Sequence, residues 1–228
     1  MDVIWNRPER NARGPKPAHT RDEVAEAGVR VADAEGIDAV SMRRVATELG
    51  VGVASLYRYL TSKDDLLDLM VDAAMRAQDP PPRSGEWRAD LRALAEAGRA
   101  LMLRHPWLPP VAAARPNLGP GSLRWMEAWY QAIDGHGLSA DEMLVSVTTV
   151  QLFVQGAVTS EVAARGLDFD AWLAAQGDYG DSIIRDGAYP ATIRVMVEAR
   201  GPHESGRGEK AFTRGLEQLL DGIAATMG

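Results

Sequence analysis

Side chains that can hydrogen-bond to a nucleic acid gather between residues 53 and 63. The polar members are Ser55, Tyr57, Arg58, Tyr59 and Lys63, and the small apolar Val53 and Ala54 precede them. An arginine can pair with a guanine edge or a phosphate, a serine with either, and a tyrosine hydroxyl with phosphate oxygens, while small apolar side chains contact a thymine methyl. Lys63 begins a predicted helix, where free amide groups and the helix dipole already favour a phosphate. This chemistry is that of a surface that binds duplex DNA.

Two short predicted helices joined by a glycine turn position this surface. Ser41 caps the first, which ends at Gly50, and the second runs from Val53 to Leu60. A longer helix precedes them, opened by the capping box Thr20-Arg21-Asp22-Glu23, and another follows from Lys63 to about Gln78. This order predicts a helix-turn-helix, and ordinary packing of three helices is the alternative.

The stretch from Thr20 to Asp68 resembles the DNA-binding domain of TetR-family regulators. The segments that carry the likeness are Ala34-Glu35-Gly36, Ser41-Met42-Arg43-Arg44-Val45-Ala46, Leu49-Gly50-Val51, Ser55-Leu56-Tyr57-Arg58-Tyr59 and Ser62-Lys63-Asp64-Asp65-Leu66-Leu67. The resemblance implies DNA contacts at Arg43, Val53, Ala54, Ser55, Tyr57, Arg58, Tyr59 and Lys63. It also implies a twofold dimer on a palindromic operator in double-stranded DNA.

A looser likeness covers much of the remaining chain. From Arg104-His105-Pro106-Trp107 through Arg115-Pro116 to Gly137-Leu138-Ser139, it is similar to the all-helical ligand-binding and dimerisation domain of tetracycline repressors. Those proteins place a metal-binding histidine five residues before the proline of Arg-Pro, where this chain has Val111. The 4 histidines also lack the spacing of a helical metal site. We therefore expect neither magnesium–tetracycline recognition nor any metal or cofactor.

Helical periodicity returns repeatedly beyond Pro80-Pro81-Pro82, and no alternating strand pattern survives, which predicts an all-α chain. The expected helices are Glu86–His105, Trp107–Ala114, Ser122–His136, Ala140–Ala164, Phe169 to about Ile184, Thr192–Ala199 and Gly208–Met227. We expect a flexible basic arm at residues 1–19, a three-helix DNA-binding domain at 20–68 and a helical ligand-binding and dimerisation domain at 69–228. The arm could reach phosphates or a minor groove, or it could be a solubilising tail.

Aromatic and polar residues of the second domain are candidates for binding a small molecule. They are His105, Trp107, Trp125, Trp129, Thr148, Gln151 and Gln155. Tryptophans four residues apart on one helix either line an apolar pocket or pack in an ordinary core. The Thr-Gln-Gln row either fixes the orientation of a ligand or lies on a solvated face. Sequence spacing leaves both alternatives open.

Two helices carry long apolar stripes. The stripes are Met143, Val147, Val150, Val154 and Ala157 on the first, and Phe212, Leu216, Leu219, Leu220, Ile223 and Met227 on the last. The family resemblance implies that these two helices pack against their twins in a homodimer. Packing within one subunit is the alternative.

Composition excludes several classes of protein. Hydrophobic residues make up 46% and charged residues 25% of the 228, as in folded globular proteins. Cysteine is absent, which excludes disulfides, cysteine-ligated metals and thiol nucleophiles, and favours the cytoplasm. We see no signal peptide and no apolar run near the roughly 20 residues of a membrane span. The net charge is −7, yet residues 1–63 carry 10 basic and 9 acidic side chains, so the acidity belongs to the rest.

Together these features predict a ligand-responsive transcriptional repressor that a small hydrophobic or amphipathic effector releases from DNA. We do not expect an enzyme, because no pair of nucleophile and base has a recognisable spacing. Two alternatives are an all-α enzyme with an incidental three-helix cap and a helical small-molecule-binding protein that does not bind DNA.

Overall fold

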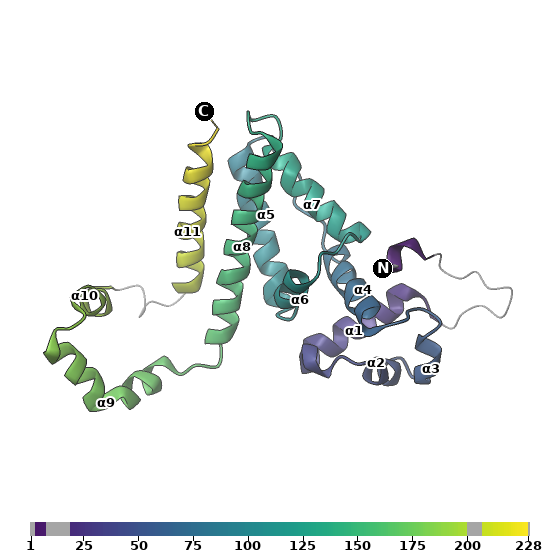
Figure 1. Ribbon diagram of the computed structural model, residues 1–228, viewed down its shortest axis with the longest axis horizontal. Coiled ribbons are helices and arrows are strands. Elements are labelled where there is room, and N and C mark those ends of the chain that lie inside the picture. The colour runs from purple at the N-terminus through teal and green to yellow at the C-terminus, as the bar shows by residue number, and fades with distance from the viewer. Residues whose placement is uncertain (1–2, 8–18, 200–206, 228) are drawn as a thin grey trace.

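The computed structural model describes residues 3–7, 19–199 and 207–227, and within these ranges the protein is all-α, without strands (Figure 1). The helices are α1 (Arg21–Glu35), α2 (Met42–Glu48), α3 (Val53–Leu56), α4 (Lys63–Arg76), α5 (Trp87–Arg104), α6 (Leu108–Ala114), α7 (Pro120–Ile133), α8 (Ala140–Ala164), α9 (Phe169–Asp186), α10 (Pro190–Glu198) and α11 (Arg207–Ala224), with short 3-10 helices at Ile4–Asn6 (η1) and Ile37–Ala39 (η2). The predicted fold class is confirmed.

The caps predicted from the sequence set the ends of the first helices. Thr20 and Glu23 form the reciprocal capping box of α1, and the hydroxyls of Ser41 and Ser62 accept hydrogen bonds at the starts of α2 and α4. α1 crosses α4 closely at Gly28, where an added Cβ would lie 2.7 Å from the sulfur of Met70. α1 and α4 thus form the base against which α2 and α3 are held.

The second short helix is shorter than the predicted span from Val53 to Leu60. Regular helix ends at Leu56, and the amides of Arg58 and Tyr59 turn back to carbonyls three residues earlier. Leu56 and Leu60 are nevertheless buried, as their spacing predicts. The chain therefore tightens into a 3-10-like turn while keeping its inward side chains inward.

α4 connects the two halves of the molecule. It packs on α1 and also on α6 and α7, so the domain boundary expected after Asp68 falls inside a continuous helix. In Figure 1, α5, α7, α8 and α11 form a bundle to the left of α4, while α9 and α10 extend away from it. The parts expected to bind DNA and a ligand consequently share one element.

The apolar stripes predicted for the dimer contact serve the subunit's own core. Val147, Val150 and Val154 are buried, as are Phe212, Leu216, Leu220 and Ile223 on α11, because α8 packs against α5, α7 and α11. For these seven residues the stripe assignment to the dimer is therefore wrong, and the alternative of packing within one subunit holds. The other stripe residues are half-buried, and their part in a dimer stays a prediction: Met143, Ala157, Leu219 and Met227. A different face of α8 is left uncovered, with Leu144, Val145 and Leu152 exposed by 51%, 64% and 62%.

This uncovered face makes α8 unusually hydrophobic for a surface helix. Within the described part of the chain it is the one helix long and apolar enough to cross a membrane by length and composition, with a mean hydropathy of 1.3. The expectation from the sequence concerned uninterrupted apolar runs, and this helix has none of that length, because threonine, glutamine and glycine separate its apolar residues. One such helix is weak evidence for a membrane span.

Part of the predicted flexible arm is ordered against the body. Ile4 in η1 is 1% exposed, and Arg7 forms an ion pair of 2.7 Å with Asp65 of α4. Arg21 of α1 donates to the Arg7 carbonyl at 2.7 Å. The prediction of flexibility is wrong for residues 3–7, because it was based on the prolines and charges of the arm and did not consider burial of Ile4. Residues 8–18 lie outside the described part of the chain.

Candidate DNA-binding surface and ligand cavity

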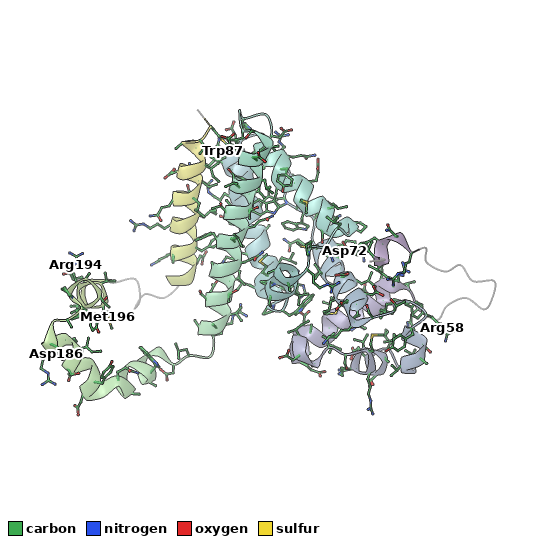
Figure 2. All side chains as sticks on the ribbon, viewed as in Figure 1. Arg58, Asp72, Trp87, Asp186, Arg194 and Met196 are labelled. Carbon is green, nitrogen blue, oxygen red and sulfur yellow. The ribbon has the colours of Figure 1, made fainter. Side chains whose placement is uncertain are left out.

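The edge of the molecule formed by α2, α3 and the start of α4 carries three exposed cationic side chains, Arg43, Arg58 and Lys63. Figure 2 shows Arg58 projecting outward near the end of α3, in the turn that follows it, and its guanidinium donates to the Ser55 hydroxyl at 3.3 Å. The neighbouring Arg44 is instead paired with carboxylates, since it contacts Glu35 at 2.6 Å and Glu48 at 3.1 Å. Of the side chains predicted to meet DNA, these three cations are therefore accessible to phosphates and bases.

The remaining predicted DNA contacts differ in exposure. Ala54 and Tyr57 are exposed, Tyr57 by 55%, whereas Val53 and Ser55 are half-buried. Tyr59 departs from the prediction, because it is half-buried and its hydroxyl accepts the backbone amide of His19 at 3.2 Å. Its position in the turn after α3 rotates the ring toward the start of α1, so its first role is to hold that segment in place.

A cavity of about 250 Å³ lies in the second half of the molecule, between α4, α5, α6, α7 and α8. Its wall includes Leu101, Trp125, Trp129, Gln151, Val154 and Gln155. An apolar wall with a few polar groups is the usual character of a site for a small organic molecule. Another hollow of about 260 Å³ opens between the proline run at residues 80–82, α5 and α7, and its lining includes the charged Arg83, Asp90, Arg124 and Glu127.

The structure divides the predicted ligand-binding residues into two groups. Trp125, Trp129, Gln151 and Gln155 lie on the cavity wall, although both tryptophans are also part of the core. Thr148 is exposed and absent from that wall, because it lies nearer the N-terminus of α8.

His105 and Trp107 form a different structure from the predicted pocket. His105 Nδ1 lies 2.8 Å from a carboxylate oxygen of Asp33, and the Trp107 indole donates to the same oxygen at 2.7 Å. Both side chains are buried and thus join the α5–α6 corner to α1. The prediction that they line the pocket is wrong, because residue type alone did not indicate the acidic partner 72 positions earlier.

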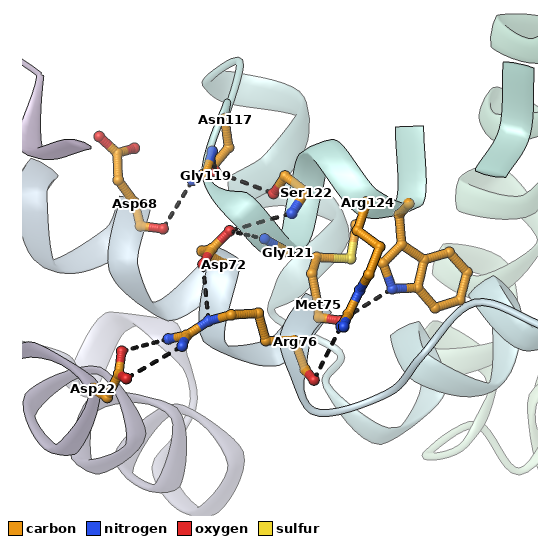
Figure 3. A network of polar contacts seen from close by, with 11 residues as sticks. Asp22, Asp68, Asp72, Met75, Arg76, Asn117, Gly119, Gly121, Ser122 and Arg124 are labelled. Carbon is orange, nitrogen blue, oxygen red and sulfur yellow. Dashed lines mark hydrogen bonds and ion pairs between the residues drawn. The ribbon is translucent and has the colours of Figure 1, made fainter. Parts of the chain in front are cut away.

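A buried carboxylate connects the cavity wall to the DNA-binding helices (Figure 3). Asp72 of α4 is 1% exposed, and one of its oxygens accepts the amides of Gly121 at 2.7 Å and Ser122 at 3.2 Å. Its other oxygen pairs with Arg76 at 3.0 Å, and Arg76 in turn holds Asp22 of α1 at 2.6 Å. Short polar contacts therefore link the start of α7 to α4 and α1.

Asp72 replaces the side-chain cap that α7 lacks. The N-cap of α7 is Gly119, which supplies no side-chain hydrogen bond, and a Cβ at Gly121 would lie 2.7 Å from the Asp72 carbonyl. Free amides at a helix start favour an anion. Glycine lets the two helices approach closely enough for the carboxylate of α4 to reach those amides.

A second polar joint lies at the loop between α6 and α7. Arg115 contacts Asp64 at 2.7 Å and Asp68 at 3.2 Å, both on α4, and Asn117 donates to the Asp68 carbonyl at 2.8 Å. Hydrogen bonding to Asp68 raises the pKa of Arg115 further above its usual value, and that to Asp64 adds to it. Residue type and spacing do not indicate these partners, because their pairing depends on how α4 packs against the loop.

No group of three or more histidine, aspartate or glutamate side chains in the described ranges is arranged to hold a metal ion. At the position of the family's metal-binding histidine, Val111 is half-buried in α6. Any ligand of this cavity would be bound by aromatic, amide and guanidinium groups.

Comparison with known proteins agrees with this arrangement. Residues 24–70 match the family described as bacterial regulatory proteins, tetR family, and residues 79–227 match the tetracyclin repressor-like C-terminal domain. The HTH-type transcriptional repressor DrrR1 of Streptomyces coeruleorubidus is 38% identical over 98% of this chain and 84% of its own. The class D tetracycline repressor of Escherichia coli is 29% identical, over 89% and 88% of the two chains.

Solved structures show the same fold. The TetR-family protein ActR of Streptomyces coelicolor, in complex with actinorhodin, superposes with a TM-score of 0.78 and 27% identity over 93% of this chain and 99% of its own. The apo form of ActR gives a TM-score of 0.73 at 29% identity, over 94% and 99% of the chains. The helix-turn-helix at one end, the helical cavity at the other and the matches to both parts lead to one conclusion: the chain belongs to the TetR family of DNA-binding transcriptional regulators.

Proposed function

We propose that this protein is a cytoplasmic transcriptional repressor that leaves its operator when a small hydrophobic or amphipathic molecule enters the cavity beside Trp125 and Trp129. The observation that carries the proposal is the polar connection from the cavity wall to α1. Ser122 lines the cavity, and its amide is bound by Asp72, which leads through Arg76 to Asp22. A ligand that displaces α7 thereby shifts the helix on which the DNA-binding surface rests.

The relatives support both parts of this proposal. DrrR1 is described as a transcriptional repressor, and ActR has been solved with actinorhodin bound. Coupling between two sites typically amounts to about 1–3 kcal/mol, so a modest difference in ligand affinity between two conformations suffices to release DNA. The ligand needs only to prefer the conformation whose DNA-binding surfaces are spaced wrongly for the operator.

We further propose a homodimer as the DNA-binding species. Leu144, Val145 and Leu152 give α8 an exposed apolar face, and a second exposed set lies on α9 and α10, where Tyr179 is exposed by 68% and Met196 by 59% (Figure 2). Exposed apolar patches of this kind mark contacts with another protein surface. A twofold axis through α8 would place two α3 segments on the halves of a palindromic operator.

Within this proposal the surfaces have distinct tasks. Arg43, Arg58 and Lys63 provide the main positive contacts to DNA, with Val53, Ala54, Ser55 and Tyr57 beside them. Trp125, Trp129, Gln151 and Gln155 contact the effector. Residues 20–68 bind DNA in this proposal, and residues 69–228 bind the effector and form the dimer, with α4 belonging to both parts.

A titration of the full-length protein on DNA upstream of its own gene tests the proposal. We expect a retarded complex of fixed stoichiometry that aromatic effector candidates dissociate. The matched variant Trp129→Ala should weaken the response to an effector more than it weakens DNA binding without one. Sequence-independent binding to that DNA, or a response to a verified effector unchanged by the substitution, would contradict it.

A further inference from the structure

We infer that Arg115 is the residue that selects the effector, and that the effector carries a carboxylate on an aromatic body. The inference rests on the proposed function in one respect, namely that the cavity receives the effector. It extends that function by assigning a chemical class to the ligand and a recognition role to a residue that neither residue type nor spacing indicated.

Arg115 has a singular position in the cavity. Among the described residues that line it, Arg115 carries the only formal charge, and the other polar groups are neutral ones such as Asn117, Ser122 and Gln151. An anionic group entering an apolar site is strongly disfavoured unless a cation meets it there. A carboxylate ligand would therefore be drawn to one end of the cavity, with its aromatic body against Trp125 and Trp129.

The present partners of Arg115 show which group its guanidinium accommodates. Its Nε and Nη2 contact the two oxygens of Asp68 at 3.2 and 3.3 Å, and its Nη1 contacts Asp64 at 2.7 Å. This forked arrangement fits planar carboxylates, which arginine binds through paired hydrogen bonds. A ligand carboxylate thus has the same chemistry as the aspartate carboxylates that Arg115 already binds, and it can take the place of one of them.

The two aspartates are not equally hard to replace. The side chain of Asp64 is exposed by 62%, whereas that of Asp68 is exposed by 16%. Arg115 itself is exposed by 34%, so a ligand can reach it from the cavity. We therefore place the ligand carboxylate in competition with Asp64, while Asp68 continues to hold the guanidinium.

This exchange of partners would also change the DNA-binding end of α4. Asp64 lies in the first turn of α4 beside Lys63, which faces the proposed DNA surface. Losing Arg115 would leave the Asp64 carboxylate uncompensated next to the position of a DNA phosphate, where a negative charge weakens binding. Recognition of the ligand's charge and release of DNA would then involve the same side chain.

The test compares 2-naphthaleneacetic acid, which is ionised at neutral pH, with its uncharged amide. Binding of each to the full-length protein without DNA is followed by tryptophan fluorescence and by calorimetry. We expect the acid to bind wild type at least about tenfold more tightly than the amide, and Arg115→Gln to remove this preference with little change for the amide. Arg104→Gln, at an exposed arginine outside the cavity wall, should retain it.

A second variant separates recognition from a merely structural contact. Asp64→Asn removes the competing carboxylate, so the acid should bind more tightly to this variant than to wild type, by about threefold or more, while the amide is unaffected. A structural role predicts weaker binding of both probes, because the α4 contact is lost. Thermal unfolding of each variant verifies that the fold is retained.

Equal binding of acid and amide to wild type, no binding of either, or an acid preference that survives Arg115→Gln would overturn the assignment. Unchanged or weaker acid binding by Asp64→Asn would overturn the competition with Asp64. Because these measurements contain no DNA, a failure of the repressor function would show only in the operator titration, where wild type would then fail to form a specific complex.

Discussion

At the scale of single residues, the exposed cations of the DNA surface separate into two kinds. Arg58 projects from the turn that follows α3, whereas Lys63 begins α4, where amides and helix dipole already favour an anion. Base contacts give sequence preference and phosphate contacts give general affinity. Replacing Arg58 or Lys63 by alanine should therefore affect DNA binding in different ways.

We predict that Arg58→Ala lowers operator affinity by about 1–3 kcal/mol, roughly 5- to 150-fold, with little effect on scrambled DNA. Lys63→Ala should weaken binding to both sequences alike and lower the salt slope by roughly one. Fluorescence anisotropy at several salt concentrations measures both quantities. A change of sequence preference in Lys63→Ala alone would show that the two assignments are reversed.

Glu217 provides a pH-dependent contact between α5 and α11. Hydrogen bonds from Arg92 and Arg88 lower its pKa from 4.5 to about 2. The lowered pKa means that the stabilisation is complete above pH 4.5 and is lost as the pH falls from there toward 2. We predict that Glu217→Gln lowers the Tm at neutral pH and flattens its decline below about pH 5.

Thermal unfolding at a series of pH values provides the measurement for Glu217. Glu26→Gln, at an exposed position of α1, is the matched control and should follow the wild-type curve. Parallel curves for Glu217→Gln and wild type would indicate that the ion pairs with Arg88 and Arg92 do not contribute to stability.

Residue chemistry in the sequence indicated some residues of the candidate sites and missed others for a definable reason. Trp125 and Trp129 could be placed because four-residue spacing puts both on one helix face. Asp72 and Arg115 could not, because their partners lie 49 and 47 positions away and meet only when α4 packs on α7 and its preceding loop. Local spacing carries no information about such pairs.

At the scale of elements, caps were readily predictable and packing faces were not. The capping boxes of α1 and α8 depend on residues three apart, and both are present. The apolar stripe of α8 correctly predicted a helix but not the helices it packs against. Val150 and Val154 could pack equally well against a twin helix or against α5 and α11. The choice depends on which surfaces the rest of the subunit supplies.

The crossing of α4 and α7 gives a prediction about an element contact. Gly121→Ala should destabilise the protein by about 1–3 kcal/mol, since the new Cβ would meet the backbone carbonyl of Asp72 and the backbone amide of Arg76 as well as the Cγ of Arg76, and the backbone atoms cannot move aside. Gly222→Ala on α11, where the added Cβ meets no atom within 4 Å, should be neutral or stabilising by up to about 1 kcal/mol. Urea unfolding of both variants tests this; similar values would contradict the close approach.

At the scale of the whole molecule, the uncovered face of α8 determines the expected assembly. We predict that Val145→Glu combined with Leu152→Glu yields folded monomers that no longer bind the operator, because charge would be buried without a partner at the twofold axis. Sedimentation equilibrium at micromolar concentration measures the mass. Leu118→Glu, at another exposed apolar position, should remain dimeric; a monomeric wild type would rule out the dimer.

The cap that Asp72 provides for α7 has a consequence for folding cooperativity. The first turn of α7 is complete only when a helix roughly fifty residues earlier is already in place, so the two ends of the molecule cannot unfold independently. Hydrogen exchange at the Gly121 and Ser122 amides should accordingly be as slow as that of the α4 backbone and accelerate with it in denaturant. A fragment beginning at residue 79 would leave both amides without their acceptor, and its α7 would fray from the first turn.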